Sequence, residues 1–202
     1  MTLVLRGVEV TLRPLSVDDV EALAAALAES REHYGFSEIP EGPEETRRYV
    51  EKALRQQAAE QRIPFTIVWC GRVVGTTSYY DFQPWEWPVG CDLQRLDRPD
   101  ALEIGYTWLA ASAQRTRCNT EAKYLLLSHA FDFWEVHRVS LRTDVRNERS
   151  RRAIERLGAQ FEGVRRADLP GQDCTVRDSA FYSIVIADWP QLQNRLREIL
   201  ES

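Results

Sequence analysis

Short runs along the chain alternate between apolar and polar residues, which is typical of strands that bury one face. In the N-terminal half one such run covers 8–13, and two more, 65–70 and 73–80, are joined by Gly71 and Arg72 as in a hairpin. The same alternation returns later in the chain, in 102–109, 138–145, 161–168 and 179–186. We expect each of these runs to form a strand.

Other stretches repeat apolar residues every three to four positions, which predicts amphipathic helices. Local signals mark several helix ends: Ser16 and Asn147 are good N-caps, Pro43 suits a first helical turn, and Gly158 suits a helix end. The expected helices begin near Ser16, in 41–46, at Glu121, at Asn147 and near Pro190.

The order of these elements is strand, two helices, two or three strands, helix, strand, helix and a closing pair of strands. This order predicts an α/β fold with a mixed sheet flanked by helices. A length of 202 residues suits a single domain, 1–202, that buries about 70% of its unfolded surface.

The stretch 103–134 is the centre of this arrangement, because its strand leads through a short polar bend into a helix. Such a bend directs free backbone N–H groups and the positive end of the helix dipole at one point, which suits a phosphate or pyrophosphate. Arg115, Arg117 and Lys123 would add charge beside it. An ordinary strand-to-helix turn with a solvated basic edge has the same spacing, so the pattern alone leaves both interpretations open.

The net charge of −5 argues against a dedicated nucleic-acid-binding protein, which normally carries a basic balance. The charge is nevertheless uneven: 81–103 holds six acids against two arginines, whereas 138–166 holds nine arginines against four acids. The first region could receive a cation and the second a polyanion, although such segregation is often only solvation of the surface.

The four cysteines are scattered, without a C-x-x-C pair or a histidine at ligand spacing, so we expect neither a disulfide framework nor a metal site. The N-terminus has no apolar signal-peptide segment, and no apolar stretch approaches the ~20 residues of a membrane helix. We therefore expect a cytoplasmic protein in a reducing compartment, without membrane or nucleic-acid partners.

The stretch 81–100 predicts a long loop that contains three prolines. A loop of this length in a compact domain is usually functional or mobile. Its Trp85 and Trp87 could wall a substrate-binding pocket, pack into a homodimer interface or cover the core. The last two are the more ordinary roles for exposed tryptophans.

Three motifs follow one another in the chain: EIGYTWL at 103–109, NTEAK at 119–123 and RTDVRNERS at 142–150. With them the chain resembles the GNAT acetyltransferase superfamily, in its Rim-type (ribosomal-protein N-terminal acetyltransferase-like) branch, over most of its length. The resemblance implies a GNAT-like α/β fold, with a mixed, mostly antiparallel twisted sheet flanked by helices and with splayed central strands. It also implies acetyl-CoA as the cosubstrate.

The family's pyrophosphate loop, Q/R-x-x-G-x-G/A, falls on 114–119. The resemblance implies that this loop holds the pyrophosphate and that the end of the preceding strand holds the pantetheine arm. Arg117 replaces the first glycine, which would allow close approach to phosphate and φ > 0. Its side chain could contact the phosphate, or it could block entry. The implied cofactor-binding residues are Trp108, Leu109, Gln114, Arg115, Thr116, Arg117, Cys118, Asn119, Thr120 and Asn147.

Many relatives place a tyrosine seven residues after the helix-opening asparagine, where it protonates the leaving thiolate. Here that position is Ile154, which cannot donate a proton. In Rim-type relatives a serine three residues after the asparagine is proposed for this role, which implies Ser150 as the acid. A serine in the first turn of a helix also bonds the backbone, so a structural role for Ser150 stays open.

The attacking amine must be neutral, and a carboxylate that reaches it directly or through one water can take up its proton. Glu103 is the candidate base, because it interrupts the apolar run of the central strand. Burial would raise its pKa toward the working pH. Glu103 could equally face outward and pair with an arginine.

We therefore predict an N-acetyltransferase that transfers the acetyl group of acetyl-CoA to a primary amine by direct attack. The amine acceptor would be a peptide N-terminus or a small molecule, and the acidic loop around Trp85 and Trp87 would suit a cationic one. The alternative is a catalytically idle acyl-CoA-binding or interaction module, which Arg117 and Ile154 motivate.

Overall fold

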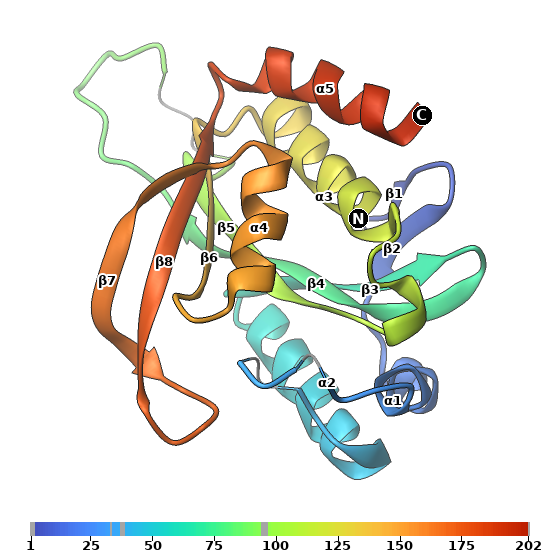
Figure 1. Cartoon of the computed structure of the whole chain (residues 1–202). Helices are drawn as coiled ribbons and strands as arrows, with labels where there is room; N and C mark the ends of the chain where they lie inside the picture. The colour runs from blue at the N-terminus through green and yellow to red at the C-terminus, as the bar shows by residue number, and fades with distance from the viewer. Residues whose placement is uncertain (1–2, 33, 37–38, 94–96, 202) are drawn as a thin grey trace.

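The computed structural model describes residues 3–201 except residues 33, 37–38 and 94–96. Within these residues eight strands form one sheet in the order β1-β2-β3-β4-β5-β6-β8-β7 (Figure 1). All neighbouring strands are antiparallel except β5 and β6, which are parallel. The strands are β1 Leu5–Arg6, β2 Val10–Pro14, β3 Arg62–Trp69, β4 Arg72–Gln83, β5 Ala101–Leu109, β6 Arg138–Asp144, β7 Gln160–Pro170 and β8 Val176–Val185.

Helices cover both faces of this sheet. In Figure 1, α1 (Val20–Ala28) and α2 (Gly42–Ala58) lie below the sheet, and α3 (Cys118–Ser128) and α5 (Trp189–Glu201) lie above it. α4 (Glu148–Leu157) follows β6 and contacts it. The predicted mixed, mostly antiparallel α/β fold is confirmed. No helix within the described ranges is both long and apolar enough to cross a membrane.

The capping signals of the sequence are used as predicted. Ser16 begins the 3-10 turn Val17–Asp19 that leads into α1, and its side chain accepts a backbone N–H of that turn. Asn147 caps α4, where its side chain accepts a backbone N–H of the first turn at 3.0 Å. Gly158 ends α4 with a φ of 95°, a conformation that favours glycine.

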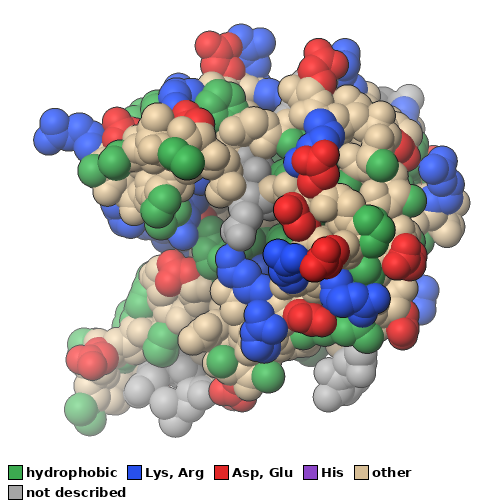
Figure 2. Space-filling view, turned by 90° about the horizontal axis from the view of Figure 1, so that it is seen from below, with side chains coloured by type: hydrophobic (Ala, Val, Ile, Leu, Met, Phe, Trp, Pro, Cys, Tyr) green, Lys and Arg blue, Asp and Glu red, His purple; other side chains and the backbone are tan. Residues whose placement is uncertain are grey.

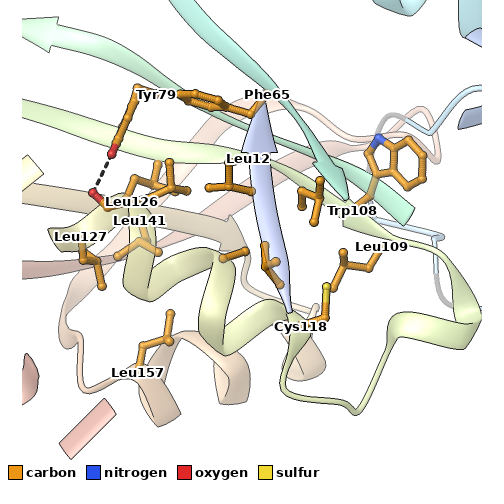
Figure 3. Packing of buried hydrophobic residues seen from close by; sticks show 14 of the residues in the cluster. Leu12, Phe65, Tyr79, Trp108, Leu109, Cys118, Leu126, Leu127, Leu141 and Leu157 are labelled. Carbon is orange, nitrogen blue, oxygen red and sulfur yellow. Dashed lines mark hydrogen bonds between the residues drawn. The ribbon is translucent and has the colours of Figure 1, made fainter. Parts of the chain in front are cut away.

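An apolar core lies between the sheet and the helices. Tyr79 of β4 is fully buried, and its hydroxyl donates to the carbonyl of Leu126 in α3 at 2.5 Å (Figure 3). Its ring meets Phe65 of β3 edge-on, with 5.7 Å between the centroids. Leu12 and Leu127 belong to the same cluster. These contacts fix α3 on the sheet, so the start of α3 has a defined position relative to β5.

A β-bulge divides β5 into two parts. Ser78 of β4 pairs with Gly105, whereas Thr76 pairs with Trp108, so β5 has one more residue than β4 between these two pairs. Tyr106 lies in this bulge and has a φ of 51°. The sequence predicted an uninterrupted alternation along this strand, and that prediction is wrong from residue 106 onward.

The bulge changes the face to which the second half of β5 turns. In a regular strand Tyr106 would share the face of Ile104, toward α3. Instead the Tyr106 ring lies 4.9 Å from the Tyr80 ring, and the Tyr80 hydroxyl bonds Glu103. Thr107 accepts a hydrogen bond from α3. Tyr106 therefore joins Glu103 on the side of the sheet that α1 and α2 cover.

The parallel pairing of β5 with β6 is short. It covers three residue pairs only: Ala101 with Arg138, Leu102 with Val139, and Glu103 with Ser140. Beyond them β5 stays paired to β4, and β6 stays paired to β8, so the two strands diverge. The predicted splay of the central strands is confirmed. It leaves the facing edges of β5 and β6 with backbone groups that no neighbouring strand pairs.

Lys123 of α3 points toward this part of the sheet. It is 6% exposed, and its Nζ donates to Thr107 Oγ1 at 2.6 Å and to Thr77 Oγ1 at 3.4 Å. It forms no ion pair with any described carboxylate, and burial lowers its pKa to about 7. The expectation that Lys123 adds charge beside the bend is therefore wrong, because its side chain is turned to the sheet.

We predict that Lys123→Met stabilises the protein at pH 7 and that this gain shrinks as the pH rises. Between a folded pKa of about 7 and the ordinary value of 10.5, the unfolded chain holds a proton that the folded protein lacks. The free energy of unfolding of the wild-type protein therefore rises with pH in this window, whereas that of the variant lacks this rise because it has no lysine at position 123. Urea unfolding of both proteins between about pH 7 and pH 10 measures the difference. A difference that stays constant with pH would contradict the buried neutral lysine.

Candidate active site

The bend after β5 leads through the 3-10 turn Ala111–Ala113 into α3 at Cys118. Cys118, Asn119 and Thr120 thus form the first turn of the helix, three residues earlier than the sequence pattern indicated. The Cys118 N–H donates to Thr116 Oγ1 at 3.1 Å. Because the first turn of a helix has no intrahelical acceptors, the amides of Asn119 and Thr120 are available to a ligand at the positive end of the helix dipole.

The conformation of the bend shows whether Arg117, in place of the motif's first glycine, blocks entry to it. Arg117 has a φ of −71° and a ψ of −13°, an ordinary helical conformation, so its position does not require glycine. The residue of the bend with a positive φ is Arg115, at 61°. The Arg117 guanidinium turns to α5, where it donates to the Leu200 carbonyl at 3.1 Å. Its side chain therefore does not block the bend, and only its backbone remains a candidate for cofactor binding.

Arg149 is a candidate site residue that the sequence reasoning missed. It lies in the first turn of α4, and its Nη2 donates to Gln114 Oε1 at 2.7 Å. Gln114 in turn donates to the Leu109 carbonyl at 2.8 Å, which connects α4 with the end of β5. Burial and the nearby charge of Arg115 lower the Arg149 pKa. The only available signal was the excess of arginines in 138–166.

The donors at this bend suit a diphosphate. Among the described residues, Arg115 and Arg149 form no ion pair, so both guanidiniums can bind anionic oxygens. The amides of Asn119 and Thr120 add uncharged donors at the same helix end. The unpaired edge of β5 ends beside them and can bond an extended chain such as a pantetheine arm. The residues present therefore fit the acetyl-CoA that the resemblance implied.

Glu103 lies where β5 and β6 begin to diverge, and it is only 2% exposed. Its Oε1 accepts a hydrogen bond from the Tyr80 hydroxyl and lies 3.1 Å from Arg142 Nε. Burial raises the Glu103 pKa, whereas Arg142 and the Tyr80 hydroxyl oppose this rise. Glu103 is therefore buried and does not face outward. Of the second alternative, only the pairing with an arginine holds.

Asp168 of β7 joins this cluster, although no sequence signal singled it out. Its Oδ2 lies 3.6 Å from Arg142 Nη1, and its Oδ1 lies 3.2 Å from Arg165 Nη1. The Asp168 side chain is 5% exposed, and its Oδ2 accepts no hydrogen bond from a described residue. Two carboxylates and two guanidiniums therefore connect β5, β6 and β7 below the splay.

A pocket of about 590 Å³ opens beside this cluster, on the side of the sheet that faces the end of α2. Its walls include Arg62, Tyr80, Tyr106, Arg142 and Arg165. Figure 2 views the molecule from this side and shows Lys and Arg side chains gathered next to a notch in the surface. Because Tyr80 and Arg142 also contact Glu103, this pocket is the candidate site for an acceptor that must reach Glu103.

Ser150 and Asn147 lie at the start of α4, just beyond β6. The cap bond joins Asn147 Oδ1 to the backbone N–H of Ser150, so it does not use the Ser150 hydroxyl. That hydroxyl forms no hydrogen bond with a described residue and is partly exposed. Ile154, one turn further along, is 7% exposed and packs in the core. Of these two positions, only Ser150 offers a group that can exchange a proton.

Trp85 and Trp87 lie at the other end of β5 and β6. The loop after β4 folds back so that Trp87 Nε1 donates to Asp100 Oδ1 at 2.8 Å, and the Trp85 ring stacks on His137 at 5.4 Å. Asp100 and His137 directly precede β5 and β6, whereas the bend follows β5. Neither tryptophan lines the pocket. The prediction that they wall a substrate pocket therefore finds no support in this geometry, and they cover the start of these two strands instead.

Comparison with known proteins places this geometry in a family. The sequence profile of the acetyltransferase (GNAT) domain matches residues 9–160. The chain is also 28% identical over 185 residues to the putative ribosomal N-acetyltransferase YdaF of Bacillus subtilis, a match that covers 89% of this chain and 93% of that protein.

Solved structures show the same fold. A putative acetyltransferase from T. thermophilus has a TM-score of 0.82 and 32% identity, over 98% of this chain and 96% of that one. RimL, the ribosomal L7/L12 alpha-N-protein acetyltransferase solved in complex with coenzyme A, has a TM-score of 0.72 and 17% identity, over 91% and 98%. The chain belongs to the acetyltransferase (GNAT) family, and its resemblance to the Rim-type branch is confirmed.

We predict that Arg115→Gln and Arg149→Gln each weaken acetyl-CoA binding by about tenfold, because each removes one unpaired guanidinium at the bend. Arg117→Gly should change the affinity by less than about threefold, because its side chain is turned to α5 and glycine is a tolerated N-cap. Isothermal titration calorimetry with acetyl-CoA measures all three dissociation constants. Arg166→Gln, on exposed β7, is the control for the loss of one positive charge. A large loss in Arg117→Gly alone would contradict this assignment.

Proposed function

We propose that this protein is an N-acetyltransferase that uses acetyl-CoA to acylate a primary amine by direct attack. The observation that carries the proposal is the position of Glu103. It is a buried carboxylate where β5 and β6 diverge, and it contacts two side chains that line an open pocket. One side of this point offers donors for the cosubstrate, and the other offers space for an acceptor.

The cosubstrate would be held by the bend and by the edge of β5. Arg115, Arg149 and the amides of Asn119 and Thr120 would bind the diphosphate, and the free edge of β5 would bond the pantetheine arm. Trp108 and Leu109 have buried side chains, so they would contribute backbone groups. Bound acetyl-CoA supplies an acetyl group that is activated as a thioester.

Glu103 would act as the general base. Burial raises its pKa and makes it a stronger base, while Arg142 and Tyr80 favour the ionised form that can accept a proton. A base in this position would take the proton from the amine directly or through one water as the new C–N bond forms. The N–H groups along the same strand could polarise the acyl carbonyl.

Ser150 would act as the general acid. Its hydroxyl is free of the cap that holds α4. It lies in the first turn of α4, next to Arg149, whose bond to Gln114 connects this turn with the end of β5. A hydroxyl there could protonate the leaving thiolate, which has an ordinary pKa near that of other thiols.

The names of the relatives support the class of acceptor. YdaF is described as a putative ribosomal N-acetyltransferase, and RimL as an alpha-N-protein acetyltransferase for ribosomal L7/L12. A peptide N-terminus is therefore the first acceptor to test, with small-molecule amines beside it.

The second candidate function is a catalytically idle acyl-CoA-binding module, which Ile154 in place of the usual tyrosine favours. Mixing the protein with acetyl-CoA, a panel of amines and a thiol-reactive dye separates the two functions. Thiol release that requires an amine supports the transferase. Tight binding without release across the panel supports the binding module, and stoichiometric release before an amine is added would contradict direct attack.

We predict that Glu103→Gln lowers kcat by at least about a hundredfold and leaves acetyl-CoA affinity unchanged, because general-base catalysis contributes 10²–10⁴-fold. In the wild-type protein kcat/KM should rise with pH through the pKa of Glu103, which burial raises above 4.5. This limb should vanish in the variant, which would keep only the titration of the amine. Glu44→Gln, an exposed carboxylate on α2, is the matched control. Unchanged turnover in Glu103→Gln would eliminate Glu103 as the base.

We predict that Ser150→Ala lowers kcat by about tenfold to a hundredfold and leaves the melting temperature within about 1 °C of wild type. The reason is that the cap of α4 uses the Ser150 backbone N–H, which alanine keeps. Turnover and thermal unfolding of the same preparation measure both effects. A loss of stability with normal turnover would assign Ser150 a structural role only.

A further inference from the structure

Arg62 of β3 is a buried cation in the wall of the pocket. It is 2% exposed, and within the described residues its hydrogen bonds go to uncharged acceptors. Its Nε donates to Ser78 Oγ at 2.7 Å, its Nη1 to Gln56 Oε1 at 3.2 Å and its Nη2 to the Tyr49 hydroxyl at 3.3 Å. A guanidinium carries five N–H donors, so two of them have no partner among the residues that the structure describes and are open to a ligand.

The ring of Tyr106 holds this guanidinium in place. The Arg62 Cζ lies 3.7 Å from the ring centroid, within the range of a cation–π contact. Tyr106 reaches Arg62 only because the bulge in β5 turns it to this face. The contact orients the cation but does not neutralise it, since a ring quadrupole is not a counter-charge.

No described carboxylate forms an ion pair with Arg62, in contrast to the other two arginines of the pocket. Arg142 is paired with Glu103 and Asp168, and Arg165 is paired with Asp168. Glu60 and Asp81 also line the pocket, but both are exposed to solvent and lie beyond ion-pair distance of Arg62. A buried charge without a partner is costly, and an anionic ligand removes that cost.

The distance between Arg62 and Glu103 indicates the spacing that such a ligand needs. Arg62 bonds Ser78, and Glu103 bonds Tyr80, two residues further along β4 on the same face. Two residues of a strand span roughly 7 Å. An acceptor with its amine at Glu103 would therefore place a group one or two residues away, by peptide length, against Arg62.

We propose that the acceptor carries a carboxylate within one or two residues of its reactive amine and that Arg62 binds this carboxylate. The proposal rests on the transferase function and deepens it, because it names the class of acceptor. It reverses the expectation of a cationic acceptor, which came from the acids of 81–103. The carboxylate can belong to an acidic residue near a peptide N-terminus or to a free amino dicarboxylic acid, and the test separates these two sources.

The test compares three peptides that share an N-terminal serine, Ser-Glu-Ala-amide, Ser-Gln-Ala-amide and Ser-Lys-Ala-amide, together with free glutamate. Each is assayed with acetyl-CoA and the thiol-reactive dye. We expect kcat/KM for the glutamate peptide to exceed that for the glutamine peptide by about tenfold or more, which is typical of a hydrogen bond to a charged group. Activity with free glutamate alone would assign the amino-acid source, and activity with the glutamate peptide would assign the peptide source.

The variants identify the residue responsible. Arg62→Gln should abolish the preference for the glutamate peptide, and Arg62→Lys should keep part of it, because the charge remains. Arg166→Gln is the matched control, since it removes an arginine from exposed β7 that does not line the pocket. Thermal unfolding reports whether each variant folds, and the comparison of peptides on the wild-type protein stands without the variants.

Equal, measurable rates for the three peptides, or a preference for the lysine peptide, would overturn the proposal, as would a preference that survives in a folded Arg62→Gln variant. If neither a peptide nor free glutamate is acetylated although acetyl-CoA binds, the proposed transferase function fails. Calorimetric binding of the glutamate and glutamine peptides to the complex with CoA then decides this inference separately. Tighter binding of the glutamate peptide that is lost in Arg62→Gln supports it, and equal binding overturns it.

Discussion

The site depends on one constraint, the early end of the parallel ladder between β5 and β6. Only three residue pairs join these strands, and the ladder stops at Glu103 and Ser140. Each strand is held from its outer side by an antiparallel partner, so the divergence does not unfold the sheet. Backbone groups on the two inner edges then lack sheet partners, and buried groups of that kind need another partner. An extended chain inserted between the strands would meet this need, and it would end beside Glu103.

The bulge at Tyr106 connects the two sides of this site. It turns Tyr106 toward Arg62 and Tyr80, and it turns Thr107 toward Lys123 on the opposite face. Gly105 makes this arrangement possible, because a Cβ there would come within 2.7 Å of the Tyr80 ring. One extra residue in β5 therefore sets both the wall of the acceptor pocket and the seat of α3, whose first turn offers the amides of the bend.

The sequence predicted those features that depend on neighbours along the chain. The caps at Ser16 and Asn147, the end of α4 at Gly158 and the hairpin of β3 with β4 all follow from local residue preferences. It failed at the bulge because the alternation in 102–109 is regular, and only the register against β4 reveals the extra residue.

The same limit applies to the site. Glu103 was predicted because a charged residue interrupts an apolar run, which is a local signal. Arg62 and Asp168 come from β3 and β7, far from Glu103 in sequence, and no local sequence pattern near them indicates the pocket. The role of the Arg117 side chain was not predictable for a related reason, because its hydrogen-bond partner is the carbonyl of Leu200 in the last helix. The positions of these side chains depend on contacts between elements that are distant in the chain. The patterns of a single sequence do not reveal such contacts.

The arginines of the pocket differ in role, because some are paired with carboxylates and Arg62 is not paired with a described one. Arg142 lies against Glu103 and opposes the rise of its pKa, so it favours a carboxylate that is ionised and ready to accept a proton. Because Arg142 comes from β6, the charge state of the candidate base depends on the strand that diverges from β5. Arg62 has no acidic partner among the described residues and is held by neutral groups and a ring. Arg142, which is paired and favours the ionised base, and Arg62, which has no acidic partner among the described residues, both lie along one face of β4. The pocket therefore offers separate places for an amine and for an anion.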